Sequence, residues 1–265
     1  MNCIIQDQKG FLWFGTQDGL NKYDGYSFTV YKHDPLDSNS LSDNFVWSMV
    51  EDRNGKIWIG TSGAGLNCFD PETESFSRFT NRTSQTNGIS SNEILAVMED
   101  RSGALWIGTR GGGLNRMDPL RQTFTVFRNN PDRASSLSDN NVYSIAEDSS
   151  GTLWIGTHNG LNRWNSADET FTRMMHHPDR EESLSDNNIR TLFVDSYNTL
   201  WIGTENGGLN RFHEREQSFT RYTNNPADKN SISHNSILSI SEDKDGALWI
   251  GTLGGGLERF NNNRF

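Results

Sequence analysis

The residue types that most often carry chemistry in proteins follow no catalytic or metal-binding pattern in this sequence. Cys3 and Cys68 lie far apart, and no His-x-His, Cys-x-x-Cys or His-Glu-x-x-His spacing occurs. Gly111–Gly113 and Gly254–Gly256 each join two predicted strands, whereas a phosphate loop opens a helix. The sequence therefore predicts no enzyme, no catalytic residue, no metal site and no cofactor. The histidines are His33, His158, His176, His177, His213 and His234.

Four Glu-Asp pairs are the remaining candidates for acid–base chemistry; they begin at Glu51, Glu99, Glu147 and Glu242. Neighbouring residues of a strand point to opposite faces, so the two carboxyl groups of a pair cannot act on one substrate. Each Asp instead opens an Asp-x-x-Gly turn, in which it can accept backbone amides while Gly takes a positive φ. Asn198 replaces the glycine in one copy, and Asn also tolerates that conformation. We interpret these Asp residues as turn caps, because the motif has too few oxygen ligands for calcium.

The turns belong to an internal repeat that positions every candidate residue. The motif Trp-Ile-Gly-Thr, with Phe for Ile in the first copy, recurs at intervals of 45, 48, 48, 47 and 48 residues. This period suits one propeller blade of four short strands. The copies begin at Trp13, Trp58, Trp106, Trp154, Trp201 and Trp249.

One copy shows how a blade is read from the sequence. Its strands A to D are predicted at 141–147, 153–157, 161–165 and 171–174, with the Asn159-Gly160 hairpin signal between B and C. In strand B, Trp and Gly are two residues apart and share a face. We therefore expect Trp to fill the gap between blades and Gly to admit a side chain of the neighbouring blade.

The repeat predicts an all-β protein: a β-propeller of six four-stranded antiparallel blades in a single domain, 1–265. An incomplete part of a larger propeller remains open, because the first copy starts inside strand A and the last ends where strand D should begin, at Phe265. The approximate blades are 1–35, 41–80, 89–128, 137–175, 184–223 and 232–265.

Charge and hydropathy narrow the classes of partner that this chain could bind. The formal net charge is −10, which disfavours nucleic acid because the phosphate backbone is also negative. No stretch approaches the roughly 18 apolar residues of a membrane helix, so no membrane segment is expected. The N-terminal residues lack the basic and apolar regions of a signal peptide.

Comparison of the six copies singles out two positions that vary sharply, one early in strand A and one directly after Gly-Thr. Strand A would be innermost if each blade runs outward, so both positions would line the mouth of a central channel. Aromatic, Arg and His side chains there suit a sugar, through stacking and planar hydrogen bonds. The opposing interpretation is that these positions vary because nothing constrains them. The first position holds Asn2, Trp47, Leu95, Tyr143, Arg190 and Leu238; the second holds Gln17, Ser62, Arg110, His158, Glu205 and Leu253. The predicted ligand-binding residues are Trp47, Tyr143, Arg190, Arg110, His158, Glu205 and Gln17.

The recurring string Ser-Leu-Ser-Asp-Asn…Glu-Asp…Gly…Leu-Trp-Ile-Gly-Thr resembles the two-component regulator propeller repeat; 136–157 is one instance. The resemblance implies the periplasmic or extracellular sensor region of a bacterial hybrid histidine kinase, often one that responds to carbohydrates. It implies a small-molecule or oligosaccharide ligand, and a dimer could form through the parent protein. Family members typically carry more repeats, in seven-bladed rings.

Three functions compete at this stage. The favoured one is a ligand-sensing module, and the alternative is a protein-interaction scaffold that uses its edges or its flat face. A propeller lyase or hydrolase is less favoured, because only His158 and Glu205 could serve as its base or acid.

Overall fold

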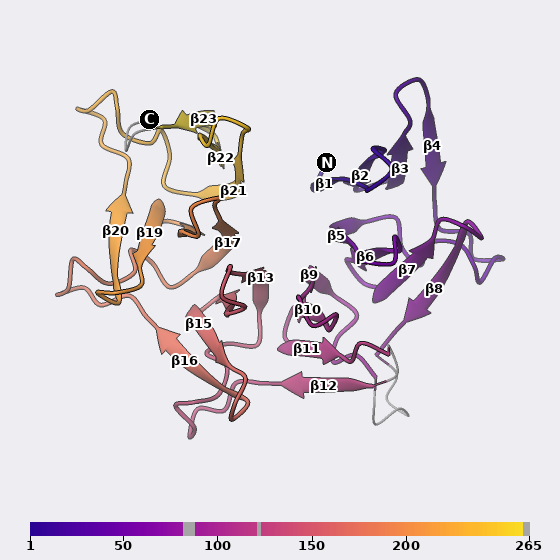
Figure 1. Cartoon of the computed structure of the whole chain (residues 1–265), viewed down its shortest axis with the longest axis horizontal. Helices are drawn as coiled ribbons and strands as arrows, with labels where there is room; N and C mark the ends of the chain where they lie inside the picture. Colours follow the sequence, from indigo (N-terminus) through magenta and orange to yellow (C-terminus); the bar gives the residue numbers. More distant parts are fainter. Residues whose placement is uncertain (82–87, 121–122, 262–265) are drawn as a thin grey trace. The chain divides into compact units, whose positions relative to one another are not determined.

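The computed structural model describes residues 1–81, 88–120 and 123–261, and all regular elements in these ranges are β-strands. The strands form six antiparallel sheets (Figure 1), of which five have four strands and the last has three. This confirms an all-β propeller fold of six blades. The fourth strand of blade 6, expected near Phe265, lies outside the described residues.

The chain divides into two compact units, Met1–Arg128 and Asn129–Phe265. The division falls at the predicted end of the third blade; that the whole chain is one domain stays a prediction. In the first unit, blade 1 contains β1 (Cys3–Gln6), β2 (Leu12–Thr16), β3 (Gly19–Tyr23) and β4 (Phe28–Tyr31). Blade 2 contains β5 (Val46–Glu51), β6 (Ile57–Thr61), β7 (Leu66–Asp70) and β8 (Ser75–Phe79). Blade 3 contains β9 (Ile94–Glu99), β10 (Leu105–Thr109), β11 (Leu114–Met117) and β12 (Phe124–Phe127).

The second unit repeats the arrangement. Blade 4 contains β13 (Val142–Glu147), β14 (Leu153–Thr157), β15 (Gly160–Asn165) and β16 (Thr170–Met174). Blade 5 contains β17 (Ile189–Val194), β18 (Leu200–Thr204), β19 (Leu209–His213) and β20 (Ser218–Tyr222). Blade 6 contains β21 (Ile237–Glu242), β22 (Leu248–Thr252) and β23 (Gly256–Phe260). In every blade the strands pair in chain order.

Neighbouring blades within a unit pack through the strand B motif. Trp154 is fully buried in one apolar cluster with Leu200, Ile202 and Phe212 of the next blade. On the same face, a Cβ at Gly156 would lie 2.6 Å from Cγ2 of Ile189, so only glycine leaves room for that side chain. Both predictions for this motif, a Trp between blades and a Gly that admits the neighbour, are confirmed.

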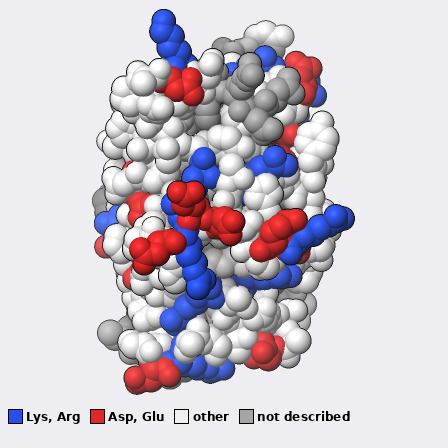
Figure 2. Space-filling view, turned by 90° about the vertical axis from the view of Figure 1, so that its left-hand side faces the viewer, with Lys and Arg blue, Asp and Glu red and all other residues white. Residues whose placement is uncertain are grey.

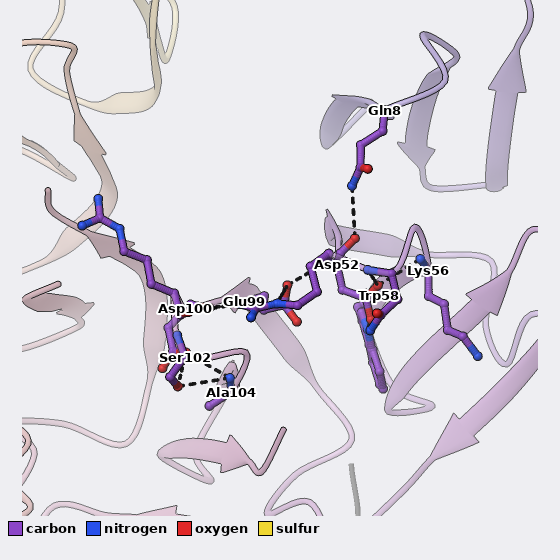
Figure 3. A network of polar contacts seen from close by, with 11 residues as sticks. Gln8, Asp52, Lys56, Trp58, Glu99, Asp100, Ser102 and Ala104 are labelled. Carbon is purple, nitrogen blue, oxygen red and sulfur yellow. Dashed lines mark hydrogen bonds and ion pairs between the residues drawn. The ribbon is translucent and has the colours of Figure 1, made fainter. Parts of the chain in front are cut away.

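The Asp of each A–B turn does more than cap the turn. In blade 2, Oδ1 of Asp52 accepts the backbone amides of Asn54 and Lys56, as predicted (Figure 3). Its Oδ2 accepts Nε1 of Trp58 at 2.9 Å. All six blades contain this Asp–Trp bond, at 2.7–3.0 Å. The turn therefore also fixes the indole of strand B.

The Glu of the Glu-Asp pairs links neighbouring turns. The carboxylates of Glu51 and Glu99 accept the amides of Gln8 and Arg53, in the turn of the preceding blade. Blade 5 has Val194 in place of Glu, and there Asn198 accepts the amide of Ser149 at 2.6 Å. Asn198 has a φ of 63°, so the residue that replaces the turn glycine also replaces the missing carboxylate.

The Oγ of Ser144 is buried without a hydrogen-bond partner among the described residues. Blade 3 has Ala96 at the equivalent strand A position. Because an unsatisfied buried hydroxyl destabilises the folded state, Ser144→Ala should leave the free energy of unfolding unchanged or raise it by about 1 kcal/mol in urea denaturation. Ala96→Ser is the matched control and should lower it. A loss of more than about 1 kcal/mol in Ser144→Ala would reveal a partner for this hydroxyl.

Candidate functional site

The variable position of strand A is a β-bulge in blades 2 to 6. In blade 5, for example, Ile189 pairs with Thr204 and Thr191 with Gly203, so Arg190 has no partner in the ladder. A bulge leaves one residue unpaired and redirects its side chain, and such bulges are common beside binding sites. The sequence identified the position but not the bulge. The five bulge residues are Trp47, Leu95, Tyr143, Arg190 and Leu238.

The second variable position is held beside the bulge by the backbone. The amide of His158, directly after Gly-Thr, donates to the carbonyl of Asn141, directly before β13, at 3.0 Å. Glu205 and Asn188 make the same bond in blade 5, at 2.9 Å. Blades 2 to 6 therefore each present two variable side chains together, at the end opposite to the A–B turn.

Four of the seven predicted residues meet in the second unit. The guanidinium of Arg190 donates through Nε to Oε2 of Glu205. Its Cζ also lies 5.2 Å from the ring centroid of Tyr143 in blade 4, in cation–π geometry. The rings of Tyr143 and His158 are 6.4 Å apart in an edge-on arrangement. We call Tyr143, His158, Arg190 and Glu205 the polar cluster.

The polar cluster contains an ion pair that a ligand can still reach. The side chains of Arg190 and Glu205 are 37% and 25% exposed. The hydrogen bond from Arg190 holds the pKa of the Glu205 carboxyl below its ordinary value; burial opposes this, and the charges of Arg190 and His158 lower the pKa further. The same bond raises the pKa of Arg190. The pair is therefore ionised, and neutral as a whole, near pH 7.

The other three predicted residues lie in the first unit, and no contact among the three is seen within the described residues. Arg110 makes an ion pair with Glu93 at 3.2 Å. Trp47 packs against Phe45, with ring centroids 4.8 Å apart. Gln17 is exposed at the end of β2. That these residues converge with the polar cluster on one channel mouth stays a prediction.

Acid should reveal the lowered pKa of Glu205. A carboxylate with a lowered folded-state pKa stabilises the fold above its unfolded pKa of about 4.3, and loses this contribution as pH falls through the folded pKa. The difference in free energy of unfolding between the wild type and Glu205→Gln should thus not shrink between about pH 8 and 5, and should shrink below about pH 4. Urea midpoints across this range measure it. A difference that already shrinks near pH 7 would contradict the ionised pair.

Two hollows lie elsewhere in the second unit, one beside β20 and one beside β19. One, of about 250 Å³, is lined by Arg173, Met174, His177 and Glu216, among others. Figure 2 shows acidic and basic side chains interleaved on the side that carries β20. Nε and Nη2 of Arg173 are already engaged, because they donate to the carbonyls of Arg133, Ser136 and Leu137. Neither hollow contains a predicted site residue.

Two histidines have a structural role that the sequence did not reveal. Nδ1 of His176 lies 2.6 Å from the carbonyl of Leu184 and closes the connector between blades 4 and 5. His33 closes the connector between blades 1 and 2 in the same way, with its Nδ1 2.8 Å from the carbonyl of Leu41. Asn129 and Asn224 close two other connectors through their side-chain amides.

Within the described ranges, no three His, Cys, Asp or Glu side chains gather in a way that could hold a metal ion. The described residues also include no helix with the length and apolar character needed to span a bilayer.

Comparison with known protein families identifies the same repeat that the sequence and the blades show. The family described as "Two component regulator propeller" matches six segments of the chain: 1–18, 40–63, 88–111, 136–159, 183–206 and 231–254. A 39-residue segment is 56% identical to histidine kinase P4 of Formosa agariphila, and covers 15% of this chain and 3% of the kinase.

Solved structures share the fold. The extracellular domain of a protein described as a hybrid two component system of B. thetaiotaomicron matches with a TM-score of 0.82 and 28% identity, over 99% of this chain and 34% of that chain. The chain thus spans about a third of that domain. A virginiamycin B lyase of Staphylococcus aureus matches with a TM-score of 0.61 and 17% identity, over 83% of this chain and 68% of that chain. At this identity the second match shows the fold alone.

Proposed function

This chain belongs to the two component regulator propeller family, and we propose that it is a ligand-binding part of the sensor region of a longer signalling protein. Its likeness to the extracellular domain of a hybrid two component system supports an extracellular or periplasmic place for this module. The output would then lie in another part of the protein. The matched segment of histidine kinase P4 supports a histidine kinase as the longer protein. A dimer could then form through that parent protein.

The polar cluster is the observation that supports ligand binding. Four side chains from two blades come together at two positions that vary sharply between repeats, and two of them, Tyr143 and Arg190, are bulge residues. A residue needed only for the fold would be the same in each blade, as the Trp and Asp of the repeat are. Their variation here fits recognition of one particular ligand.

A carbohydrate suits the chemistry of this cluster. A guanidinium–carboxylate pair offers fixed donors and acceptors to neighbouring hydroxyl groups of a sugar, while the Tyr143 ring offers apolar surface. The pair is neutral as a whole, so the ligand needs no charge of its own. We propose an uncharged mono- or oligosaccharide.

The same geometry argues against catalysis at the polar cluster. Glu205 is ionised near neutral pH because its pKa is lowered by Arg190, so it cannot serve as a general acid there. Its carboxylate is also engaged as an ion-pair partner, which makes it a weaker base. This supports a binding module over a lyase or hydrolase.

Binding of neutral saccharides tests the proposal. Wild-type protein should bind at least one member of an array of uncharged mono- and oligosaccharides. Arg190→Ala combined with Tyr143→Ala should abolish that binding, because hydrogen bonds from a charged group to the ligand contribute about 1.5–3 kcal/mol each. The melting temperature should stay nearly unchanged. Arg53→Ala is the matched control, since Arg53 pairs with Glu99 at the A–B turn end. If no saccharide binds, or if the double variant binds as the wild type does, the proposal is wrong.

A further inference from the structure

Two asparagines directly follow two members of the polar cluster. Asn159 comes after His158, and Asn206 comes after Glu205. Among the six copies of the repeat, asparagine stands at this position only in blades 4 and 5, the two blades that form the polar cluster. The other four copies have Asp18, Gly63, Gly111 and Gly254.

Turn geometry does not account for these two asparagines. Asparagine is common in turns because it tolerates a positive φ, or because its side chain bonds to nearby backbone. Neither Asn159 nor Asn206 takes a positive φ, whereas Asn198 of an A–B turn does. Both are bonded only through the backbone within the described part of the chain, and both are exposed. What asparagine adds at these positions is therefore an unengaged carboxamide.

The carboxylate of Asp186 holds the Asn206 turn against the bulge of blade 5. Its Oδ1 accepts the amide of Asn188 at 3.2 Å, and its Oδ2 accepts the amide of Asn206 at 3.0 Å. Asn188 stands two residues before Arg190, and its carbonyl accepts the amide of Glu205. The Asn206 carboxamide is thus carried on backbone that is fixed beside the ion pair of the polar cluster.

The Asn159 turn of blade 4 is bonded to the same short segment. The amide of Asn159 donates to Oγ1 of Thr157 at 3.2 Å. The next amide, that of Gly160, donates across the blade interface to the carbonyl of Asn187 at 2.7 Å. Residues 186–188 therefore bond to both turns at once. The two carboxamides are brought together on the two sides of the segment that leads into the bulge.

A carboxamide suits the ligand class proposed for this site. Its NH₂ group donates hydrogen bonds and its oxygen accepts them, and it carries no charge. The ion pair of Arg190 and Glu205 is neutral as a whole, so two further uncharged groups keep the site matched to a neutral sugar. A site that bonds a hydroxyl group also discriminates strongly against the analogue that lacks this group.

We infer that Asn159 and Asn206 are specificity-determining residues of the saccharide site. Each binds through its carboxamide to a ligand hydroxyl group that the polar cluster does not bind. The inference rests on the proposed function, because it extends the same site.

Isothermal titration calorimetry on the whole chain tests this. The probe is the array saccharide that binds the wild type most tightly, supplied as its methyl glycoside. Asn159→Ala and Asn206→Ala should each weaken binding about two- to tenfold, as expected for the loss of one neutral hydrogen bond. The melting temperature should stay unchanged, because neither side chain is bonded in the fold. Asn54→Ala is the matched control: Asn54 is an exposed turn asparagine at the A–B end, and this variant should bind as the wild type does.

Singly deoxygenated forms of the same glycoside identify the hydroxyl group that each asparagine binds. For each alanine variant, one deoxy form should bind to the variant and to the wild type equally well, because the wild type has already lost that bond. Wild-type affinity in both variants, an equal loss in Asn54→Ala, or an unchanged effect of the variants on every deoxy form would overturn the inference. The proposed function would then stand if Arg190→Ala with Tyr143→Ala abolishes binding. Failure of every saccharide to bind would overturn the proposed function, and the inference with it.

Discussion

Trp154→Ala should lower the free energy of unfolding by about 3–5 kcal/mol, the largest effect expected from a single side chain in this protein. Trp154 is 1% exposed and packs between blades 4 and 5, with its ring 5.0 Å from that of Phe212. Its Nε1 also donates to Oδ2 of Asp148 at 3.0 Å. Truncation would remove both contacts and leave a cavity that the surrounding strands cannot close. Equilibrium urea denaturation measures the effect.

Two controls separate packing from hydrogen bonding at this site. Trp154→Phe keeps most of the ring and loses the bond to Asp148, so it should cost less than Trp154→Ala. Trp47→Ala removes an indole from a bulge, where the ring is only partly buried, and should cost less still. A loss below about 1 kcal/mol for Trp154→Ala would mean that the strand B face does not hold the blades together.

Gly203→Ala should destabilise the protein by about 1–3 kcal/mol although it adds a single methyl group. The new Cβ would lie 2.6 Å from Cγ2 of Ile237 in blade 6 and 2.6 Å from Cγ2 of Thr191. Both are branched side chains, so the two blades would have to move apart. Thermal and urea unfolding of the variant measure the loss.

Gly251→Ala is the matched substitution in blade 6. Its Cβ would come close only to the Oγ of Ser239, at 2.4 Å, and that hydroxyl can rotate away. We therefore expect a smaller loss than for Gly203→Ala. Equal losses for the two variants would show that the clash with the neighbouring blade is not the cause.

Much of the fold could be predicted because each blade repeats the same local signals. The strand predicted at 153–157 is observed with the same bounds, as β14 (Leu153–Thr157). The preceding strand begins one residue later than predicted, at Val142, because Asn141 instead bonds through its carbonyl to the amide of His158. Alternation and turn residues determine strand bounds locally, which is why these predictions succeeded.

The sequence could indicate which residues form the candidate site, but not how their side chains contact one another. Variation between copies indicated Arg190 and Glu205, but their ion pair depends on the rotamers of two long side chains, which no sequence pattern specifies. The bulge was missed because one extra residue does not disturb the alternating pattern before it or after it, so the sequence still looks like a regular strand. The Asp–Trp bonds were missed because they join residues six apart across a turn.

The central claim is that a ligand binds at the polar cluster, and nuclear magnetic resonance tests it most directly. In ¹⁵N-labelled protein, the Nε–H signal of Arg190 reports on that cluster, and the indole Nε1–H signals of the six strand B tryptophans report on the opposite end of the blades. Titration with the glycoside that binds best should shift the Arg190 signal and leave the six indole signals in place. If the indole signals shift and that of Arg190 does not, the ligand binds elsewhere and the claim is wrong.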